Sequence, residues 1–413
     1  MTMPNVTEDT LVDQGAIPPT DFHDKIERIR EISEFDIDPP PDLSARLARE
    51  TEGLLLAQET MKAAAAALRV GHLVLQGPPG TGKSSLARAL CGAFHASAFP
   101  VTAHEDWTVF DLIGRLELRL HEDRKEEIVP VNGYFTESVI RCANTIVRHF
   151  DDPTEPQAEW LLIDELNRAH MDRAFGELFT VLGTDAVIPV TLPHQREGNR
   201  NLVIPKRFRI VATLNSFDRQ FVNNLSQAIR RRFTFINVDI PAKRPDSESW
   251  TNTTPPVSLA VQEFRVVMDR VVDRVARRLT AQNSAGTQVT SEAVKARLGG
   301  PFLPLLRQFF DFVERVRYAK MDQKVPHLPI GTAQLIDTVE LFLLRVYQDE
   351  VSDARADEML DWAVSVKIAP LFDLDVVAPE IIREFAGTLS APFNHATRRE
   401  LLGIVAAGMH FVE

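Results

Sequence analysis

A glycine-rich stretch near residue 80 has the residue types and the spacing that phosphate binding requires. It reads Gly-Pro-Pro-Gly-Thr-Gly-Lys-Ser over residues 77–84, which fits the pattern G-x-x-x-x-G-K-[ST]. Glycines let the backbone curl so that successive N–H groups point at phosphate oxygens. Lys83 brings a positive charge to the β- and γ-phosphates, and the Ser84 hydroxyl is a ligand for Mg²⁺. The expected nucleotide contacts come from Gly77, Pro78, Pro79, Gly80, Thr81, Gly82, Lys83, Ser84 and Ser85.

Two adjacent carboxylates, Asp164 and Glu165, follow a short apolar run at residues 160–163. If this run is a strand of a parallel sheet, its carboxyl end brings Asp164 beside the phosphate-binding stretch. We expect Asp164 to contact nucleotide-bound Mg²⁺, directly or through water, and Glu165 to polarise the attacking water. A buried strand that ends in two acids needs a compensating charge, and a bound cation supplies it. The pair therefore indicates hydrolysis of a nucleoside triphosphate.

Polar residues also follow two later strand candidates. Asn215 ends an apolar run that starts at residue 208, where its amide can position a water; a simple strand-end turn is the alternative. Arg230, Arg231 and Arg232 stand in a row before the next strand candidate. Such a row is usually a solvated face. Arginine nevertheless suits bidentate contact with phosphate, so we expect Arg231 and Arg232 to reach the transferring phosphoryl group of a neighbouring subunit.

The elements that would position these residues alternate between strand and helix. This alternation predicts an α/β fold with a parallel sheet covered by helices, and an all-helical unit after it. The predicted strands are 72–76, 98–102, 160–163, 208–213 and 233–238, with helices at 54–68 and 84–94. The helices of the second unit are expected at 259–280, 302–320, 332–349, 354–367, 379–389 and 395–408.

Composition sets the class of protein. The chain has 413 residues, 44% of them hydrophobic and 25% charged, as in an ordinary soluble protein. No apolar run approaches the roughly 18 to 20 residues that span a bilayer, and no secretory signal is visible. Cys91 and Cys142 lie among apolar neighbours without metal-ligand spacing, which favours buried free thiols and a cytoplasmic location. The net charge of −12 argues against the chain wrapping DNA by itself.

Four stretches together resemble the MoxR, McrB and dynein-related branch of the AAA+ ATPases. They are GPPGTGKS at 77–84, LLIDELNRA at 161–169, ATLNSFDR at 212–219 and AIRRRF at 228–233. The resemblance implies ATP and Mg²⁺ as cofactors. Under it Lys83 and Ser84 are Walker A residues, Asp164 and Glu165 the Walker B pair, Asn215 sensor 1, and Arg231 and Arg232 arginine fingers acting in trans.

The resemblance also implies an organisation for the chain. Asp-Leu-Ile-Gly at 111–114 matches a signature ahead of a first inserted hairpin, expected at 116–131, and a second is expected at 186–204. We divide the chain into a flexible N-terminal tail (1–48), a P-loop αβα core with both hairpins (49–240), a linker (241–257) and a helical lid or C-terminal domain (258–413). A recruitment role for the tail stays open.

The chain departs from its relatives at the position called sensor 2. Many of them carry an arginine at the start of a lid helix. The matching stretch here, residues 329–334, reads Pro-Ile-Gly-Thr-Ala-Gln and holds no arginine. Gln334 is a weak substitute, and Arg345 lies too far along the expected helix.

Three functions fit these residues. The first is a homo-oligomeric ring, hexameric in many relatives, that remodels or powers a protein partner as MoxR-like proteins do, with a von Willebrand A-type protein encoded nearby. The second is the motor of a McrB-like restriction or phage-defence complex with a separate nuclease, where some relatives use GTP. The third is a nucleotide-gated scaffold, which the intact acidic pair opposes. Direct DNA binding is left open; the cations Arg115, Arg119, Arg124 and Lys125 suit a basic pore or a solvated turn.

Overall fold

The computed structural model describes residue 31 and residues 34–120, 126–176, 178, 182, 190–191, 201–202, 204–216, 227–282, 289–319, 325–349, 351–372 and 377–409. The chain forms two compact units. The first contains the described residues of 1–54, 58–77 and 83–238. The second contains those of 239–413, together with 55–57 and the residues 78–82 of the phosphate-binding stretch.

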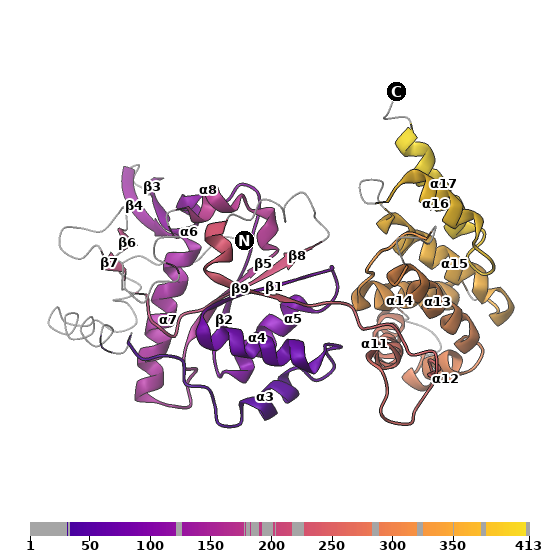
Figure 1. Ribbon diagram of the computed structural model, residues 1–413, viewed down its shortest axis with the longest axis horizontal. Coiled ribbons are helices and arrows are strands. Elements are labelled where there is room, and N and C mark those ends of the chain that lie inside the picture. Colours follow the sequence, from indigo (N-terminus) through magenta and orange to yellow (C-terminus); the bar gives the residue numbers. More distant parts are fainter. Residues whose placement is uncertain are drawn as a thin grey trace. The chain divides into compact units, whose positions relative to one another are not determined.

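A five-stranded sheet forms the centre of the first unit (Figure 1). Its strands are β1 (His72–Gly77), β2 (Ser97–Thr102), β5 (Glu159–Asp164), β8 (Ile210–Asn215) and β9 (Phe233–Asn237), in the order β2-β5-β8-β1-β9. All four pairs of neighbouring strands are parallel. In β5 every residue before Asp164 is buried, as expected of a strand covered on both faces. The predicted α/β class is confirmed.

Helices flank this sheet. α4 and α5 pack on β1, and α7 packs on β5. The helical segments of the first unit are α3 (Leu43–Glu50), α4 (Gln58–Val70), α5 (Lys83–Ala93), α6 (Val109–Leu112), α7 (Tyr134–Asp151), η1 (Leu166–Arg168), α8 (Met171–Phe175) and α10 (Gln227–Arg230). Cys91 on α5 and Cys142 on α7 are buried free thiols, and burial raises the pKa of each to about 12.

Two antiparallel strand pairs lie outside the main sheet. β3 (Gly114–Leu120) pairs with β4 (Glu126–Asn132), in the segment where the first hairpin is expected. Gly114 has a φ of +136°, and a Cβ there would lie 2.5 Å from the Val131 carbonyl oxygen, so the hairpin base requires glycine. β6 (Val190–Thr191) pairs with β7 (Asn201–Leu202) inside 186–204; residues 186–189, 192–200 and 203 of that second segment lie outside the described residues.

Residues 34–48, predicted as part of a flexible tail, contact the core. The Asp38 backbone exchanges hydrogen bonds of 3.0 and 2.9 Å with the Gln157 side chain. Arg207 Nε donates to the Asp36 carbonyl oxygen at 3.0 Å. Ile37, between Asp36 and Asp38 in the sequence, is buried. α3 packs on α5. The tail interpretation is therefore wrong for this part, because a polar segment here finds fixed partners that its composition does not reveal.

Beyond residue 258 all described secondary-structure elements of the second unit are helical, as predicted. Its segments are α11 (Leu259–Gln282), α12 (Ser291–Gly299), α13 (Leu303–Arg317), α14 (Thr332–Gln348), η3 (Asp353–Arg355), α15 (Ala356–Lys367), η4 (Ala369–Leu371), α16 (Pro379–Gly387) and α17 (Ala396–Met409). The stretch 241–257, predicted as a linker, packs on α13: Trp250 is buried and donates from Nε1 to Asp311 at 2.6 Å. In the part of the chain that is described, no helix has the length and apolar character needed to cross a bilayer.

A buried ion pair joins three helices of the second unit. Arg317 of α13 donates to both carboxylate oxygens of Glu263 of α11, at 2.6 and 2.9 Å. Arg317 Nε also donates to the Ile330 carbonyl oxygen at 2.7 Å, and Thr332 Oγ1 donates to Glu263 at 2.6 Å. The side chains of the pair are 4% and 1% exposed, so solvent does not screen it. The network fixes the first turn of α14.

Replacing Glu263 with alanine should therefore destabilise the second unit strongly. Removal of one member leaves the Arg317 guanidinium buried without its carboxylate, which typically costs about 3–5 kcal/mol. We expect a lower urea midpoint for loss of helical circular dichroism. Glu358→Ala is the control, because it breaks the exposed Arg355–Glu358 pair and should leave the midpoint nearly unchanged. Equal midpoints for the two variants would contradict this account.

Candidate functional site

The phosphate-binding stretch connects β1 to α5. Gly80 and Gly82 have left-handed backbones, with φ of +76° and +91°, which side chains disfavour. Lys83 is 6% exposed, and its Nζ donates to the Gly77 carbonyl oxygen at 2.9 Å. Thr81 Oγ1 donates to the Pro78 carbonyl oxygen at 3.0 Å. The loop thus curls back on its own start, and α5 begins at its end, as phosphate binding at a helix N-terminus requires.

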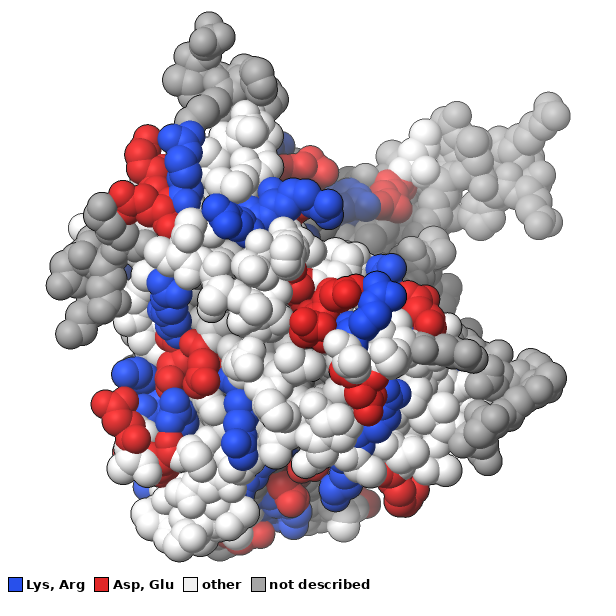
Figure 2. Space-filling view, turned by 90° about the vertical axis from the view of Figure 1, so that its right-hand side faces the viewer, with Lys and Arg blue, Asp and Glu red and all other residues white. Residues whose placement is uncertain are grey.

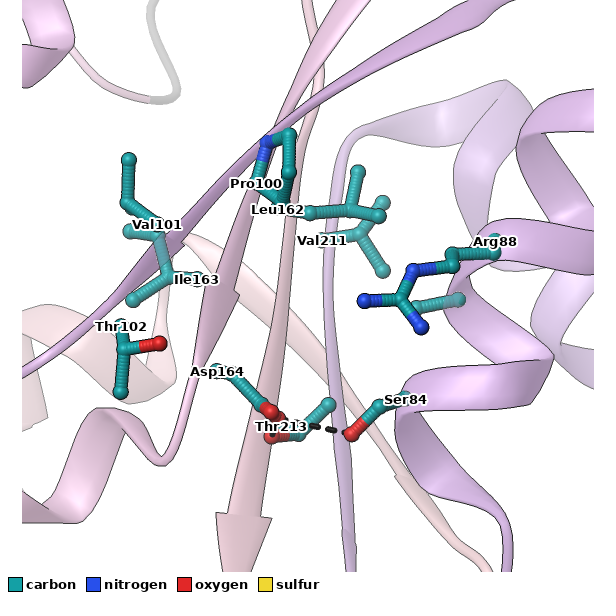
Figure 3. Close-up of a pocket in the computed structure, with 11 residues that line it drawn as sticks. Ser84, Arg88, Pro100, Val101, Thr102, Leu162, Ile163, Asp164, Val211 and Thr213 are labelled. Carbon is teal, nitrogen blue, oxygen red and sulfur yellow. Dashed lines mark hydrogen bonds between the residues drawn. The ribbon is translucent and has the colours of Figure 1, made fainter. Parts of the chain in front are cut away.

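The predicted metal ligands are in direct contact. Ser84 Oγ donates to Asp164 Oδ1 at 2.8 Å, and both side chains point into the same space in Figure 3. A hydroxyl and a carboxylate are oxygen donors of the kind Mg²⁺ accepts, and Mg²⁺ usually takes its remaining ligands from water and substrate phosphates. Among the described residues there is no cluster of three His, Cys, Asp or Glu that would hold a metal alone. The donor set therefore fits a nucleotide-bound magnesium ion.

Glu165 follows Asp164 with an unusual backbone. Its φ is +54°, in the left-handed region that residues other than glycine rarely adopt. Its N–H donates to Thr213 Oγ1 at 3.0 Å. Its carboxylate forms an ion pair with Arg168, with 2.6 Å between Oε2 and Nε, within the turn that β5 enters. The left-handed backbone therefore turns the chain directly after β5 ends at Asp164.

Asn215 lies at the same edge of the sheet as the loop. It pairs in register with Gly77, the first residue of the phosphate-binding stretch. Its N–H donates to Asn167 Oδ1 at 3.1 Å, which ties the end of β8 to η1. The structure therefore brings Lys83, Asp164 and Asn215 to one edge, as the sequence predicts.

A cavity of about 140 Å³ lies beside Ser84 and Asp164 (Figure 3). It is smaller than the roughly 300 Å³ at which pockets for whole organic ligands begin, so it does not hold a nucleotide. Arg88, one helical turn after Ser84, extends toward it from α5. Its lining residues are Ser84, Ala87, Arg88, Pro100, Val101, Thr102, Leu162, Ile163, Asp164, Val211 and Thr213.

Arg231 and Arg232 lie at the other end of the strands, beside their amino ends. They directly precede Phe233, which pairs with His72 at the amino end of β1, whereas the loop follows the carboxyl end. At about 3.3 Å per residue the length of β1 separates the two by roughly 17 Å. Arg231 is exposed, and its side chain makes no hydrogen bond or ion pair within the described residues. These arginines are therefore not positioned to contact phosphates bound to their own loop.

Gln334, the weak substitute for sensor 2, lies against the loop residues of the second unit. The Ala333 N–H donates to the Gly80 carbonyl oxygen at 3.3 Å. A Cβ on Gly80 would lie 2.4 Å from Gln334 Oε1, and this buried oxygen has no hydrogen-bond partner among the described residues. Arg345 instead pairs with Asp349 at 2.9 Å and stacks on Trp362. The polar side chain that α14 places beside the loop is thus the neutral amide of Gln334 and not an arginine.

The sequence did not predict Thr213, Arg168 or Arg88 as site residues. Thr213 could have been found, because it lies two residues before Asn215 and so on the same face of the strand. Arg88 lies four residues after Ser84, on the same side of α5. Arg168 had no such signal, because its contact depends on the left-handed turn at Glu165.

A parallel sheet with this loop and these acids defines a P-loop nucleotide-binding core. Residues 72–233 match the family of AAA domains, dynein-related subfamily. This segment is therefore an AAA domain of that subfamily, in agreement with its motifs. A search of curated proteins finds none that matches the chain.

Proposed function

We propose that the protein hydrolyses ATP with Mg²⁺ at the edge of the sheet formed by the ends of β1, β5 and β8. Residues 77–85 hold the phosphates, Ser84 and Asp164 hold the metal ion, and Glu165 takes a proton from the attacking water. The hydrogen bond of 2.8 Å between Ser84 and Asp164 carries this proposal. It joins two motifs 80 residues apart in the sequence and brings together two oxygen-bearing side chains of the kind that Mg²⁺ accepts.

The chemical contribution of the protein is position and charge. Bound magnesium neutralises developing negative charge on the phosphates. Lys83 adds a second positive charge from the base of the loop. The Glu165 carboxylate is the proton acceptor, and the Asn215 amide orients the water it acts on. Because Glu165 is paired with Arg168 at 2.6 Å, catalysis requires that the carboxylate turn toward the water.

The proposed arginine fingers imply an oligomer. Since Arg231 and Arg232 lie roughly 17 Å along the sheet from the loop of their own chain, they stabilise the transferring phosphoryl group only in a neighbouring subunit. Head-to-tail contacts of this kind close into rings. We therefore propose a homo-oligomeric ring with a nucleotide at each subunit boundary, hexameric as in many relatives.

Mixing two inactive variants tests the trans arrangement. Arg231→Ala/Arg232→Ala subunits lack the fingers, and Glu165→Gln subunits lack the base. In an equal mixture about a quarter of boundaries pair an intact base with intact arginines, so ATPase activity should return to roughly a quarter of wild type. Co-purification of differently tagged variants verifies that mixed assemblies form. Mixed assemblies without any recovered turnover would argue against fingers in trans.

The partner of the ATPase is proposed to be a protein, as for MoxR-like relatives. Arg115, one candidate for a basic pore, is paired with Asp111 at 3.2 Å and with Glu117 at 2.7 Å, so its charge is neutralised locally. The face drawn in Figure 2 carries Lys and Arg interspersed with Asp and Glu among its described residues, rather than one basic area. DNA binding needs a cluster of unpaired basic side chains.

A pull-down with the Glu165→Gln variant in ATP and Mg²⁺ tests this choice. A chaperone-like role predicts nucleotide-dependent capture of a protein such as one of von Willebrand A type. The alternative, a McrB-like restriction motor, predicts capture of a nuclease and salt-dependent binding of duplex DNA. Replacing ATP by GTP in the same experiment shows whether the protein prefers an adenine or a guanine nucleotide.

A further inference from the structure

The Thr213 hydroxyl contacts both acids of the proposed site. Thr213 belongs to β8 and is 4% exposed. Its Oγ1 donates to Asp164 Oδ1 and accepts the Glu165 N–H at 3.0 Å. Figure 3 places its side chain against that of Asp164. The register of β5 with β8 ends at Ile163 and Ala212, so Thr213 lies next to Asp164 one step further along the two strands.

The chemistry of a hydroxyl suits both contacts at once. It has a single hydrogen to donate and lone pairs to accept with, whereas an ionised carboxylate only accepts and an amide N–H only donates. Because both partners are fixed, the hydroxyl has one consistent orientation. A valine of the same shape would make neither contact, and a serine would make both.

The contact also determines which Asp164 oxygen faces a metal ion. Asp164 Oδ1 accepts from both Ser84 and Thr213. Its other oxygen, Oδ2, receives no hydrogen bond within the described residues. Two hydroxyls on one oxygen therefore hold the carboxylate plane and leave Oδ2 for a cation or its water shell.

The second contact supports the backbone of Glu165. A left-handed residue other than glycine is strained and persists only where its surroundings fix it. At Glu165 the φ is +54°, and its N–H donates to the side chain of Thr213 rather than to a backbone carbonyl of β8. This turn sets the direction in which the Glu165 carboxylate leaves β5.

We propose that Thr213 is a positioning residue for the ATPase reaction, whose hydroxyl fixes both the metal-binding face of Asp164 and the turn that presents Glu165. Through β8 it also connects both acids to Asn215, two residues further along the strand. This inference rests on the proposed ATP hydrolysis.

The test compares Thr213→Val with Thr213→Ser in steady-state ATP hydrolysis, over a range of ATP and of Mg²⁺ concentrations. Loss of a buried hydrogen bond to a charged group predicts that Thr213→Val lowers kcat about 10- to 100-fold and raises the Mg²⁺ concentration needed for half activity. The KM for ATP should stay within about 3-fold, because the loop is untouched. In equilibrium calorimetry, which needs no turnover, Mg²⁺ should increase the affinity of Thr213→Val for ATP less than it does for the wild type. Thr213→Ser should recover kcat to within about 3-fold of wild type.

Thr397→Val is the matched control, since it removes another buried hydroxyl that donates to a backbone oxygen, in the second unit. Its kcat should equal that of the wild type. If Thr213→Val had the kcat and the Mg²⁺ dependence of the wild type, the inference would be overturned. It would also be overturned if Thr213→Ser lost as much kcat as Thr213→Val. A wild-type chain that neither binds nor hydrolyses Mg·ATP would overturn the proposed function, and this inference with it.

Discussion

Replacing Lys83 with alanine is expected to abolish binding of ATP and Mg²⁺ and, with it, ATP hydrolysis. The side chain is 6% exposed, and its ammonium group lies against the first residue of the loop, 2.9 Å from the Gly77 carbonyl oxygen. Each charge-assisted hydrogen bond to phosphate contributes about 1.5–3 kcal/mol. Losing contacts to two phosphates therefore weakens binding by at least roughly 100-fold.

Isothermal titration calorimetry with Mg·ATP measures this loss directly. Lys62→Ala is the control, because Lys62 on α4 is exposed and pairs with Glu59 at 3.2 Å, outside the loop. It should bind as the wild type does. Circular dichroism checks that the Lys83 variant keeps its fold. If that folded variant bound Mg·ATP within about 3-fold of wild type, the loop would not be the phosphate site.

Replacing Glu165 with glutamine is expected to separate binding from turnover. Glutamine keeps the size of the side chain and the left-handed backbone, but a neutral amide does not accept the proton of water. Loss of a general base typically lowers kcat about 10²- to 10⁴-fold. Nucleotide affinity should persist, because the loop, Ser84 and Asp164 are unchanged. The bound state should accumulate and favour the assembled form.

Steady-state hydrolysis and mass photometry in ATP measure both effects. Glu52→Gln, at an exposed position of the first unit, serves as the control and should behave as wild type. Hydrolysis by Glu165→Gln at the wild-type rate would require a different proton acceptor. A variant of Arg168 should be measured in the same assay. Glu165→Gln also removes the carboxylate charge that pairs with Arg168 at 2.6 Å, so the two effects need to be separated.

The loop and the acidic pair could be predicted from sequence because their signals are local. Glycines at 77, 80 and 82 have few reasons to stand before Lys83 other than a tight turn around an anion. An apolar run that ends in Asp164 needs a partner at a sheet edge, and parallel strands place all such ends together. The register of Gly77 with Asn215 follows from the same rule.

The rest depends on contacts between residues far apart in the chain. Composition predicted a tail at 34–48 because it averages over residues, whereas Asp36 bonds to Arg209 from 173 residues away. Thr213 looked like an ordinary β-branched strand residue, and only its hydrogen bond to Asp164, 49 residues earlier, gives it a role. Side-chain hydrogen bonds of this kind need the fold before they can be seen.

An equilibrium titration of the purified wild-type chain with ATP, in Mg²⁺ and then with Mg²⁺ chelated, tests the central claim most directly. A phosphate-binding loop next to Ser84 and Asp164 predicts saturable binding of about one nucleotide per chain. Chelation of the metal should weaken this binding by roughly 10-fold or more. Absence of saturable binding for every nucleoside triphosphate tried with Mg²⁺ would contradict it.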